Sequence, residues 1–429
     1  MTSLTSALSQ GVAIAAALVS VPLTVGYLGQ ERYGIWLTLS SLLSWLAIAD
    51  LGLGGGAIVN ALSDANGRDD RALAQELVAT GFWTLAGISL VLAALFAAAF
   101  PFVSWAAVFN VSAAVPPGEL RSAVVLAFAA FVLTFPTSVF GAAYHGYQEG
   151  YVGNLWVAAG SALSLAALLV VTRFEGGLPQ LVLALWGARF VVGLGSAVYL
   201  FGRLRPWLLP RPGAATRRAF GRLMALGLQY LVAQLAGLGM FQSQPILVTH
   251  LVGPSAVAVF AVAQRLLTLP LVAVQIATFP LMPAYGEARV REDWTWIRRT
   301  LQRSLRYAAL AAPCLILPLA LAAPAVVRRW VGPQMVPSGA VIGGLAVYCV
   351  VCALLTPVSV MLYGLEQIRG QARIALLNAV LTVSAGVAFT RLWGLPGMAA
   401  AMVLGMLAGN AVGQWLEATR ALKSAPPAA

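Results

Sequence analysis

The sequence predicts an all-α integral membrane protein with about twelve transmembrane helices in two six-helix lobes. Of its 429 residues, 60% are hydrophobic and only 9% are charged, whereas about a quarter of the residues of a soluble domain are charged. The charges fall between apolar runs such as 78–100, 152–172 and 305–327, each close to the ~20 residues that a spanning helix needs. A water-soluble fold has no way to cover this much apolar surface.

The expected spans follow these apolar runs in order. In the first lobe they are 6–28, 34–62, 73–99, 121–142, 151–172 and 178–202; in the second they are 223–250, 254–283, 301–323, 338–363, 372–390 and 396–416. The connection 203–222 holds three prolines and six arginines, which indicates a linker between an N-terminal lobe, 1–202, and a C-terminal lobe, 223–420. A cytoplasmic tail, 421–429, follows. The arginines of the linker are expected to contact anionic lipid headgroups.

The basic residues between the spans predict the orientation of the chain, because arginine and lysine collect in cytoplasmic loops. One side carries 18 of them and the other side six, so both termini are expected in the cytoplasm. The larger group is Arg68, Arg71, the six arginines of 203–222, the six of 289–306, Arg369, Arg373, Arg420 and Lys423; the smaller is Arg32, Arg121, Arg173, Arg328, Arg329 and Arg391. Although the net charge is +12, no basic stripe on a soluble face indicates nucleic-acid binding. The N-terminus lacks the basic region of a cleavable signal peptide.

The two lobes look like copies of one another in the same orientation. A shift of 224 residues lays Gly29 on Gly253 and Asp69 on Asp293, and Pro22 and Pro245 agree to within one position. The segments 144–147 and 362–365 match at a shift of 218. Parallel repeats of this kind are typical of transporters.

Helices one and two contain a kink and an intramembrane acid. Pro22 removes a backbone hydrogen bond in helix one, as Pro245 does in helix seven, so both are candidate gating kinks. Asp50 lies inside helix two, where an ionised carboxylate costs about 2.5–3.5 kcal/mol; it either takes part in ion coupling or caps the helix segment that the glycines of 52–56 loosen. The same glycines fit a dinucleotide-binding pattern, but no βαβ unit surrounds them.

The segments Tyr27-Leu28-Gly29-Gln30-Glu31-Arg32-Tyr33-Gly34-Ile35-Trp36 and Ala49-Asp50-Leu51-Gly52-Leu53-Gly54 resemble the polysaccharide transporter family, which contains the O-antigen flippases. That family belongs to the multidrug/oligosaccharidyl-lipid/polysaccharide (MOP) flippase superfamily, which the second half also resembles through 264–266 and 280–283. The resemblance implies two lobes around a central cavity that opens alternately to each side. It also implies a glycan on undecaprenyl pyrophosphate as substrate, as in lipopolysaccharide O-antigen or exopolysaccharide biosynthesis, and polysaccharide-assembly proteins as partners.

Helix eight carries the sharpest candidate site. Gln264, Thr268, Leu271, Gln275, Thr278 and Met282 recur at helical spacing, which places four polar side chains along one line. Arg265 flanks this line, and a guanidinium pairs with phosphate through two hydrogen bonds. We therefore predict that Arg265 binds the substrate pyrophosphate in the cavity; the alternative is a structural pair with Asp50 or with a helix end.

Two further spans contribute weaker candidates. Tyr230, Gln234 and Gln244 fall on one face of helix seven, with Gly237 and Phe241 between them, and are expected to line the cavity or to form interhelical hydrogen bonds. Arg189 in helix six is a second candidate for the phosphates, and the alternative is that its side chain snorkels toward the membrane surface.

These features favour a flippase of the inner membrane that works by alternating access and needs no cofactor. No phosphate loop is present, because the only lysine is Lys423, so the chain is not its own ATPase. No metal site is predicted: the two histidines are isolated, and the three cysteines lie in apolar spans. The alternatives are a cation-coupled multidrug exporter of the same superfamily and, less favoured, a polytopic glycan polymerase or ligase. For such an enzyme, the longest periplasmic loop, 101–120, offers only Glu119 as a catalytic group.

Overall fold

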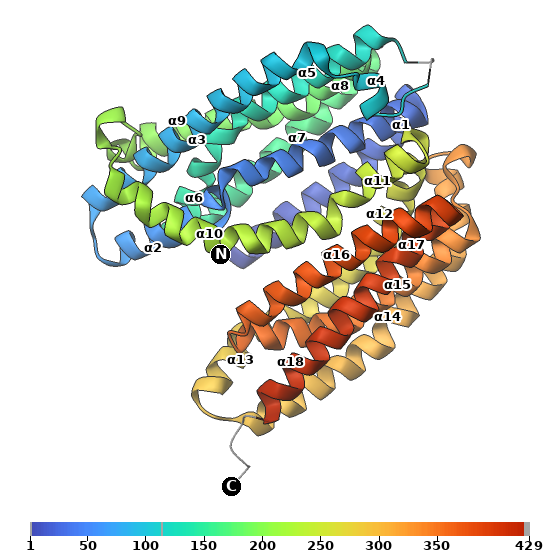
Figure 1. Ribbon diagram of the computed structural model, residues 1–429. Coiled ribbons are helices and arrows are strands. Elements are labelled where there is room, and N and C mark those ends of the chain that lie inside the picture. Colours follow the sequence, from blue (N-terminus) through green and yellow to red (C-terminus); the bar gives the residue numbers. More distant parts are fainter. Residues whose placement is uncertain (1, 113–114, 424–429) are drawn as a thin grey trace. The chain divides into compact units, whose positions relative to one another are not determined.

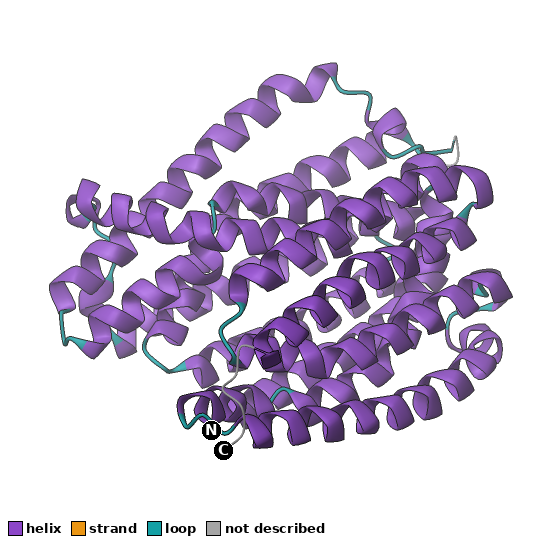
Figure 2. Ribbon diagram, turned by 60° about the horizontal axis from the view of Figure 1, so that its bottom comes forward, coloured by secondary structure: helices purple, strands orange, loops and turns teal. Residues whose placement is uncertain are grey.

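The computed structural model describes residues 2–112 and 115–423, and these residues form helices joined by loops, without a strand (Figures 1 and 2). The expected all-α class is therefore confirmed. The chain divides into two compact units, Met1–Gln234 and Leu235–Ala429.

The helices of the N-terminal unit are α1 (Thr2–Leu46), α2 (Ile58–Gly67), α3 (Arg71–Ala99), α4 (Trp105–Val108), α5 (Pro117–Thr134), α6 (Ser138–Gly146), α7 (Gly150–Arg173), α8 (Leu178–Val182), α9 (Ala188–Tyr199) and the first part of α10 (Arg217–Phe241). The C-terminal unit contains the end of α10, then α11 (Ser243–Leu251), α12 (Pro254–Thr278), α13 (Leu281–Val290), α14 (Trp294–Trp330), α15 (Gly339–Gly364), α16 (Ile368–Trp393), α17 (Leu395–Leu404) and α18 (Val412–Lys423). Several expected spans thus consist of two consecutive helices joined by a short 3-10 or π segment.

Eleven stretches of the described residues are long and apolar enough to cross a membrane, against about twelve expected. The difference lies in α1, where a single stretch covers most of the first two expected spans. Gly29 interrupts this helix with φ 81° and ψ 173°, a backbone conformation that glycine adopts without a steric penalty. The expected helices one and two therefore meet at Gly29 almost without a loop, and about twelve spans remain.

The second expected span, 34–62, is not one continuous helix. After α1, a 3-10 turn (Ala47–Asp50) leads to Leu51 and Gly52, both with positive φ, and a π segment (Leu53–Ala57) precedes α2. A Cβ on Gly52 would lie 2.2 Å from the carbonyl oxygen of Gly227, so only glycine permits α10 to approach this closely. The glycines of 52–56 were expected to loosen the second span locally, but the α-helix is interrupted at this segment.

The expected linker, 203–222, packs against the N-terminal unit. The indole Nε1 of Trp83 donates to the carbonyl oxygen of Pro210 at 3.2 Å, and the backbone N–H of Thr216 donates to Thr80 Oγ1 at 3.1 Å. The division between the units falls later, between Gln234 and Leu235 inside α10. These hydrogen bonds join residues more than 120 positions apart, so sequence composition alone does not reveal them.

The same close helix contact occurs in both units. A Cβ on Gly146 of α6 would lie 2.7 Å from Leu62 Cβ of α2, and a Cβ on Gly364 of α15 would lie 2.6 Å from Tyr285 Cβ of α13. Tyr285 follows Leu62 by 223 positions and Gly364 follows Gly146 by 218, which are within one position of the shifts expected for the repeat. The internal repeat is therefore present in the packing of the helices as well as in the sequence.

Helix starts and glycine conformations follow the repeat too. Asp70 caps α3 by accepting from Leu73 N, and Asp293 caps α14 by accepting from Trp296 N, each at 2.9 Å. Asp70, rather than the expected Asp69, is thus the counterpart of Asp293. Gly253 has φ 124° and ψ 163° between α11 and α12, so it shares with Gly29 a positive φ and an extended ψ.

Each unit buries its own apolar core and exposes further apolar side chains on its outer helices. Tyr144 and Leu77 are fully buried in the N-terminal unit, and Tyr285 and Ile297 in the C-terminal unit. Leu90 on α3 and Leu321 on α14 are 72% and 85% exposed. Apolar exposure of this extent on long helices is expected where lipid chains cover the surface.

Candidate functional site

The polar line expected on helix eight lies on α12 of the C-terminal unit. Gln264 donates through Nε2 to Oε1 of Gln244 on α11 at 3.0 Å, which ties the two helices together. The hydroxyls of Thr268 and Thr278 donate to carbonyl oxygens of their own helix, Gln264 O at 2.9 Å and Val274 O at 2.7 Å. Gln264, Thr268 and Gln275 are half-buried, whereas Thr278 is buried. The line thus offers three partly accessible polar side chains.

Arg265 is the charged residue of α12, and its side chain is exposed. Among residues 2–112 and 115–423, no carboxylate forms an ion pair with it. Asp50 belongs to the N-terminal unit, where its carboxylate accepts from backbone N–H groups, and the alternative of a structural pair of Arg265 with Asp50 or with a helix end stays a prediction. An exposed guanidinium on an apolar helix remains available for an anion.

The polar face expected on helix seven is split between two helices. Helix α10 ends at Phe241 and α11 begins at Ser243, so Gln242 interrupts the expected span. Tyr230 and Gln234 belong to the N-terminal unit, where Tyr230 Oη accepts from Asn60 Nδ2 and Gln234 Nε2 donates to Ala47 O at 3.4 Å. The interhelical hydrogen bonds expected as the alternative role are thus formed within the N-terminal unit.

The two prolines proposed as kinks differ in their surroundings. Pro245 lies three residues after the interruption at Gln242, and it has no N–H to donate to the carbonyl of Phe241, which explains why the helix breaks there. Pro22 lies within α1, whose non-helical residue is Gly29. The helix is therefore interrupted near Pro245, whereas α1 continues through Pro22.

Asp50 is buried and caps the interruption between α1 and α2. Its Oδ1 accepts from Gly52 N at 2.8 Å, and its Oδ2 accepts from Gly54 N at 3.1 Å. The amide of Gln234 is a further hydrogen-bond partner of this carboxylate. Both oxygens are thus engaged in holding the turn, which favours the structural role of Asp50 over the coupling role.

Replacing Asp50 with alanine is expected to destabilise the protein. Loss of both acceptors leaves the N–H groups of Gly52 and Gly54 without partners, and an unsatisfied buried donor costs about 1–3 kcal/mol. We expect a lower midpoint of thermal unfolding in detergent for Asp50→Ala and an intermediate value for Asp50→Asn, which keeps one acceptor. An unchanged midpoint in Asp50→Ala, together with lost transport, would indicate ion coupling instead.

Arg189 lies at the start of α9, directly after a π segment (Leu183–Gly187). Its side chain is exposed, and its guanidinium carbon lies 5.5 Å from the ring centroid of Trp186. Arg189 belongs to the N-terminal unit and Arg265 to the C-terminal unit. Cation–π contact with Trp186 gives Arg189 a local structural role.

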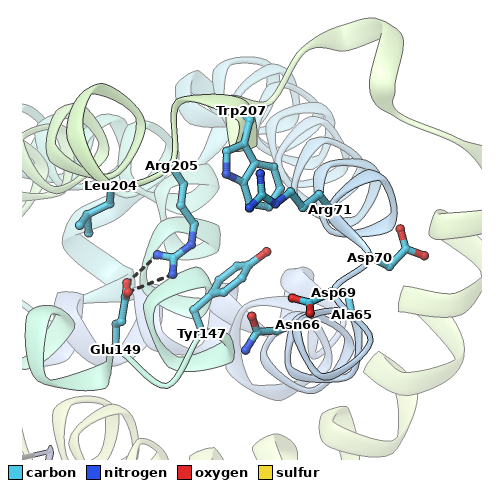
Figure 3. A pocket seen from close by; sticks show the side chains of 10 residues that line it. All are labelled: Ala65, Asn66, Asp69, Asp70, Arg71, Tyr147, Glu149, Leu204, Arg205 and Trp207. Carbon is cyan, nitrogen blue, oxygen red and sulfur yellow. Dashed lines mark hydrogen bonds and ion pairs between the residues drawn. The ribbon is translucent and has the colours of Figure 1, made fainter.

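The structure also contains a polar pocket that the sequence analysis did not predict (Figure 3). Arg71, Tyr147, Glu149, Arg205 and Trp207 line it together with residues of the α2–α3 connection. The sequence had marked parts of it separately, Asp69 and the segment 144–147 through the repeat and Arg71 and the linker 203–222 through their basic charge, but nothing in the sequence brought them together. The pocket forms because three connections distant in sequence meet at one end of the N-terminal unit.

Comparison with known sequences yields one family. Residues 3–286 match the family model described as "Polysaccharide biosynthesis protein". No protein of curated function matches the chain at a significant level. The matched segment covers the N-terminal unit together with α11, α12 and half of α13.

Several solved structures share the fold over almost their entire length. An inward-facing multidrug resistance MATE family transporter of the MOP superfamily matches with a TM-score of 0.76 at 17% identity, covering 96% of this chain and 100% of that chain. The lipid II flippase MurJ, in an inward closed conformation, matches with a TM-score of 0.75 at 10% identity, covering 97% and 89%. A MOP superfamily transporter from Pyrococcus furiosus matches with a TM-score of 0.67 at 18% identity, covering 98% and 95%. At these identities, the matches establish the fold.

Proposed function

This chain belongs to the polysaccharide biosynthesis protein family and has the fold of MOP superfamily transporters, and we propose that it flips an oligosaccharide linked to undecaprenyl pyrophosphate across the bacterial inner membrane. The proposed cycle is alternating access, in which the binding site opens first to the cytoplasm and then to the periplasm. Both termini lie in the cytoplasm in this proposal, as the distribution of arginines indicates. The lipid tail remains in the bilayer while the pyrophosphate and the glycan cross.

The observation that carries the proposal is Arg265, an exposed guanidinium in the interior of an apolar span without a carboxylate partner in the described part of the chain. A charge at such a depth costs about 2.5–3.5 kcal/mol on insertion scales, and such residues commonly mark substrate pathways. Pyrophosphate would offset this cost by accepting two charge-assisted hydrogen bonds. The polar side chains of Gln264, Thr268 and Gln275 lie along the same helix and supply further hydrogen bonds.

A cation-coupled multidrug exporter is the second candidate within the same fold. Binding of cationic drugs favours free intramembrane carboxylates, and Asp50, an acid well inside an expected span, already accepts backbone hydrogen bonds with both oxygens. Arg189 and Arg265, in contrast, have no ionic partners among the residues described. This balance favours an anionic cargo.

A glycan polymerase or ligase is less favoured, because the acid of the longest periplasmic loop is already engaged. Glu119 accepts two hydrogen bonds from Arg32, at 2.8 and 2.9 Å, and a third from the backbone N–H of Leu178 at 3.1 Å. A carboxylate held by three donors is a structural anchor rather than a free acid or base.

Deletion of the gene tests the proposed function directly. We expect undecaprenyl-linked repeat units to accumulate on the cytoplasmic leaflet, where added periplasmic enzymes do not reach them, and polymer on the cell surface to be lost. Complementation with the wild-type gene and with Arg299→Ala, which alters an exposed arginine of α14, should restore the polymer. Unchanged lipid-linked glycans, with increased sensitivity to cationic drugs, would overturn the proposal in favour of the multidrug exporter.

A further inference from the structure

The polar pocket of the N-terminal unit has a volume of about 270 Å³ and lies between three connections of the chain (Figure 3). The end of α2 contributes residues 65 and 66, and the following turn with the start of α3 contributes 69–71. The α6–α7 connection contributes Tyr147 and Glu149, and the segment after α9 contributes Leu204, Arg205 and Trp207. Drug-sized ligands occupy pockets of roughly 300–1,000 Å³. This pocket therefore suits a small polar group.

The bounds of the candidate spans predict that the pocket lies at the depth of the lipid headgroups. Three candidate spans end or begin at its wall, since one starts at Arg71, one ends at Gly146 and one ends at Leu204. Tryptophan and tyrosine are enriched at this level of a membrane protein, and Trp207 and Tyr147 lie there with their rings 6.3 Å apart. The arginine distribution predicts that this end of the unit faces the cytoplasmic leaflet.

Two of the charged side chains of the pocket hold its walls together. Arg205 donates to both carboxylate oxygens of Glu149, at 2.6 and 2.9 Å, and its guanidinium carbon lies 4.0 Å from the ring centroid of Tyr147. The hydrogen-bonded Glu149 raises the pKa of Arg205 further above its ordinary value, although burial opposes this shift. This pair joins the segment after α9 to the α6–α7 connection and is satisfied without a ligand.

Three charged side chains of the pocket, Asp69, Asp70 and Arg71, form no ion pair among the described residues. Arg71 lies over Trp207, with its guanidinium carbon 5.7 Å from the ring centroid, and forms no ion pair with a carboxylate. Asp69 likewise forms no ion pair, whereas its neighbour Asp70 caps α3. Figure 3 shows Asp69 and Arg71 on opposite sides of the space into which the Tyr147 hydroxyl points.

Tyr147 supplies a hydrogen-bond donor between these two charges. Burial raises the pKa of its phenol, although Arg205 and Arg71 act in the opposite direction. The hydroxyl therefore keeps its proton at neutral pH and can donate to an anion that Arg71 attracts. The amide of Asn66 lies on the Asp69 side of the pocket (Figure 3).

We propose that this pocket binds a phosphoethanolamine group, with the phosphate on Arg71 and the Tyr147 hydroxyl and the ammonium on Asp69. Two sources carry this chemistry, the headgroup of phosphatidylethanolamine in the adjacent leaflet and the free phosphate ester. A phosphatidylglycerol headgroup has no cation for Asp69, and the quaternary ammonium of phosphatidylcholine has no N–H to donate to it. The site thus selects one zwitterion among the common headgroups.

Native mass spectrometry of the full chain, delipidated in detergent, tests the proposal without any measurement of transport. We expect wild-type protein to retain one phosphatidylethanolamine at concentrations where phosphatidylglycerol and phosphatidylcholine dissociate. Arg71→Gln and Asp69→Asn should each weaken this binding about tenfold or more, because each removes one charge-assisted contact. Tyr147→Phe, which deletes only the hydroxyl, should weaken it several-fold.

Arg211→Gln is the matched control, because Arg211 is an exposed arginine of the same connection as Arg205 but does not line the pocket. It should bind phosphatidylethanolamine like the wild type. Added O-phosphoethanolamine separates the two sources: displacement of the lipid at low millimolar concentration supports the free ester, and its failure to displace supports the headgroup. Equal binding of all three lipids, or binding that Arg71→Gln leaves unchanged, would overturn the site.

Discussion

We expect Arg265→Ala to lose glycan flipping while it remains folded and inserted in the membrane. If Arg265 holds the pyrophosphate, the variant lacks both hydrogen bonds of the guanidinium and leaves two phosphate charges without a counterion inside an apolar span. Loss of one partner of such a charge pair costs about 2–5 kcal/mol, which corresponds to a roughly 30-fold or greater loss of transport. Arg265→Lys keeps the positive charge but cannot form the two parallel hydrogen bonds of a guanidinium to a phosphate, and it should retain part of the activity.

The measurement is flipping of a lipid-linked oligosaccharide in proteoliposomes, scored by its accessibility to an added glycosidase. Arg299→Ala serves as the matched control, since it removes an exposed arginine of α14 without an ionic partner among the described residues. The unfolding midpoint of each variant in detergent shows whether a loss of transport comes from unfolding. Flipping at the wild-type rate by Arg265→Ala would exclude this residue as the phosphate site.

A large structural effect is expected at the repeated glycines, Gly146 and Gly364. In Gly146→Ala the added Cβ meets Leu62 Cβ at 2.7 Å and Val59 O at 3.2 Å, and in Gly364→Ala it meets Tyr285 Cβ at 2.6 Å and Met282 O at 2.7 Å. Backbone atoms and Cβ atoms do not move aside without displacing a helix. Overpacking of this kind costs about 1–3 kcal/mol for each substitution, so both variants should unfold at a clearly lower temperature, and the double variant should not accumulate in a folded form.

The same two helices provide matched controls for this prediction. Gly141 on α6 and Gly343 on α15 have no atom within 4 Å of an added Cβ. Alanine at these positions should leave the unfolding midpoint unchanged or raise it, because alanine favours a helix by about 0.5–1 kcal/mol over glycine. Equal effects of alanine at Gly146 and at Gly141 would show that helix propensity, and not the contact with α2, determines the outcome.

Most of the helical architecture could be predicted from the sequence, because it depends on local composition. An apolar run of the length of the bilayer must form a helix to satisfy its backbone hydrogen bonds in lipid, and α3, α7, α15 and α16 begin and end within four residues of their predicted bounds. The internal repeat could be recognised in the sequence for a similar reason, because it depends on local backbone conformation. Glycines such as Gly29 and Gly253 are required by the backbone conformation at equivalent positions of the two units.

The roles of the polar side chains depended on contacts that local composition does not reveal. Asp50 was an equally good candidate for ion coupling or for a cap until its carboxylate was seen to bind the N–H groups of Gly52 and Gly54. The sequence marked Pro22 and Pro245 alike as kinks, and only the structure shows that the helix is interrupted near Pro245 while α1 continues through Pro22. The expected linker proved to be attached to the N-terminal unit by hydrogen bonds from distant helices.

The sequence by itself therefore determined that this protein is a helical membrane protein with an internal repeat and an intramembrane arginine, Arg265. Only the tertiary structure decided which helices are interrupted, which polar groups are already satisfied, and that Arg71, Tyr147 and Asp69 surround one pocket. The physical reason is the range of the interactions. Hydrophobic spans follow from neighbouring residues, whereas a pocket needs side chains from connections that lie more than 50 positions apart in the chain.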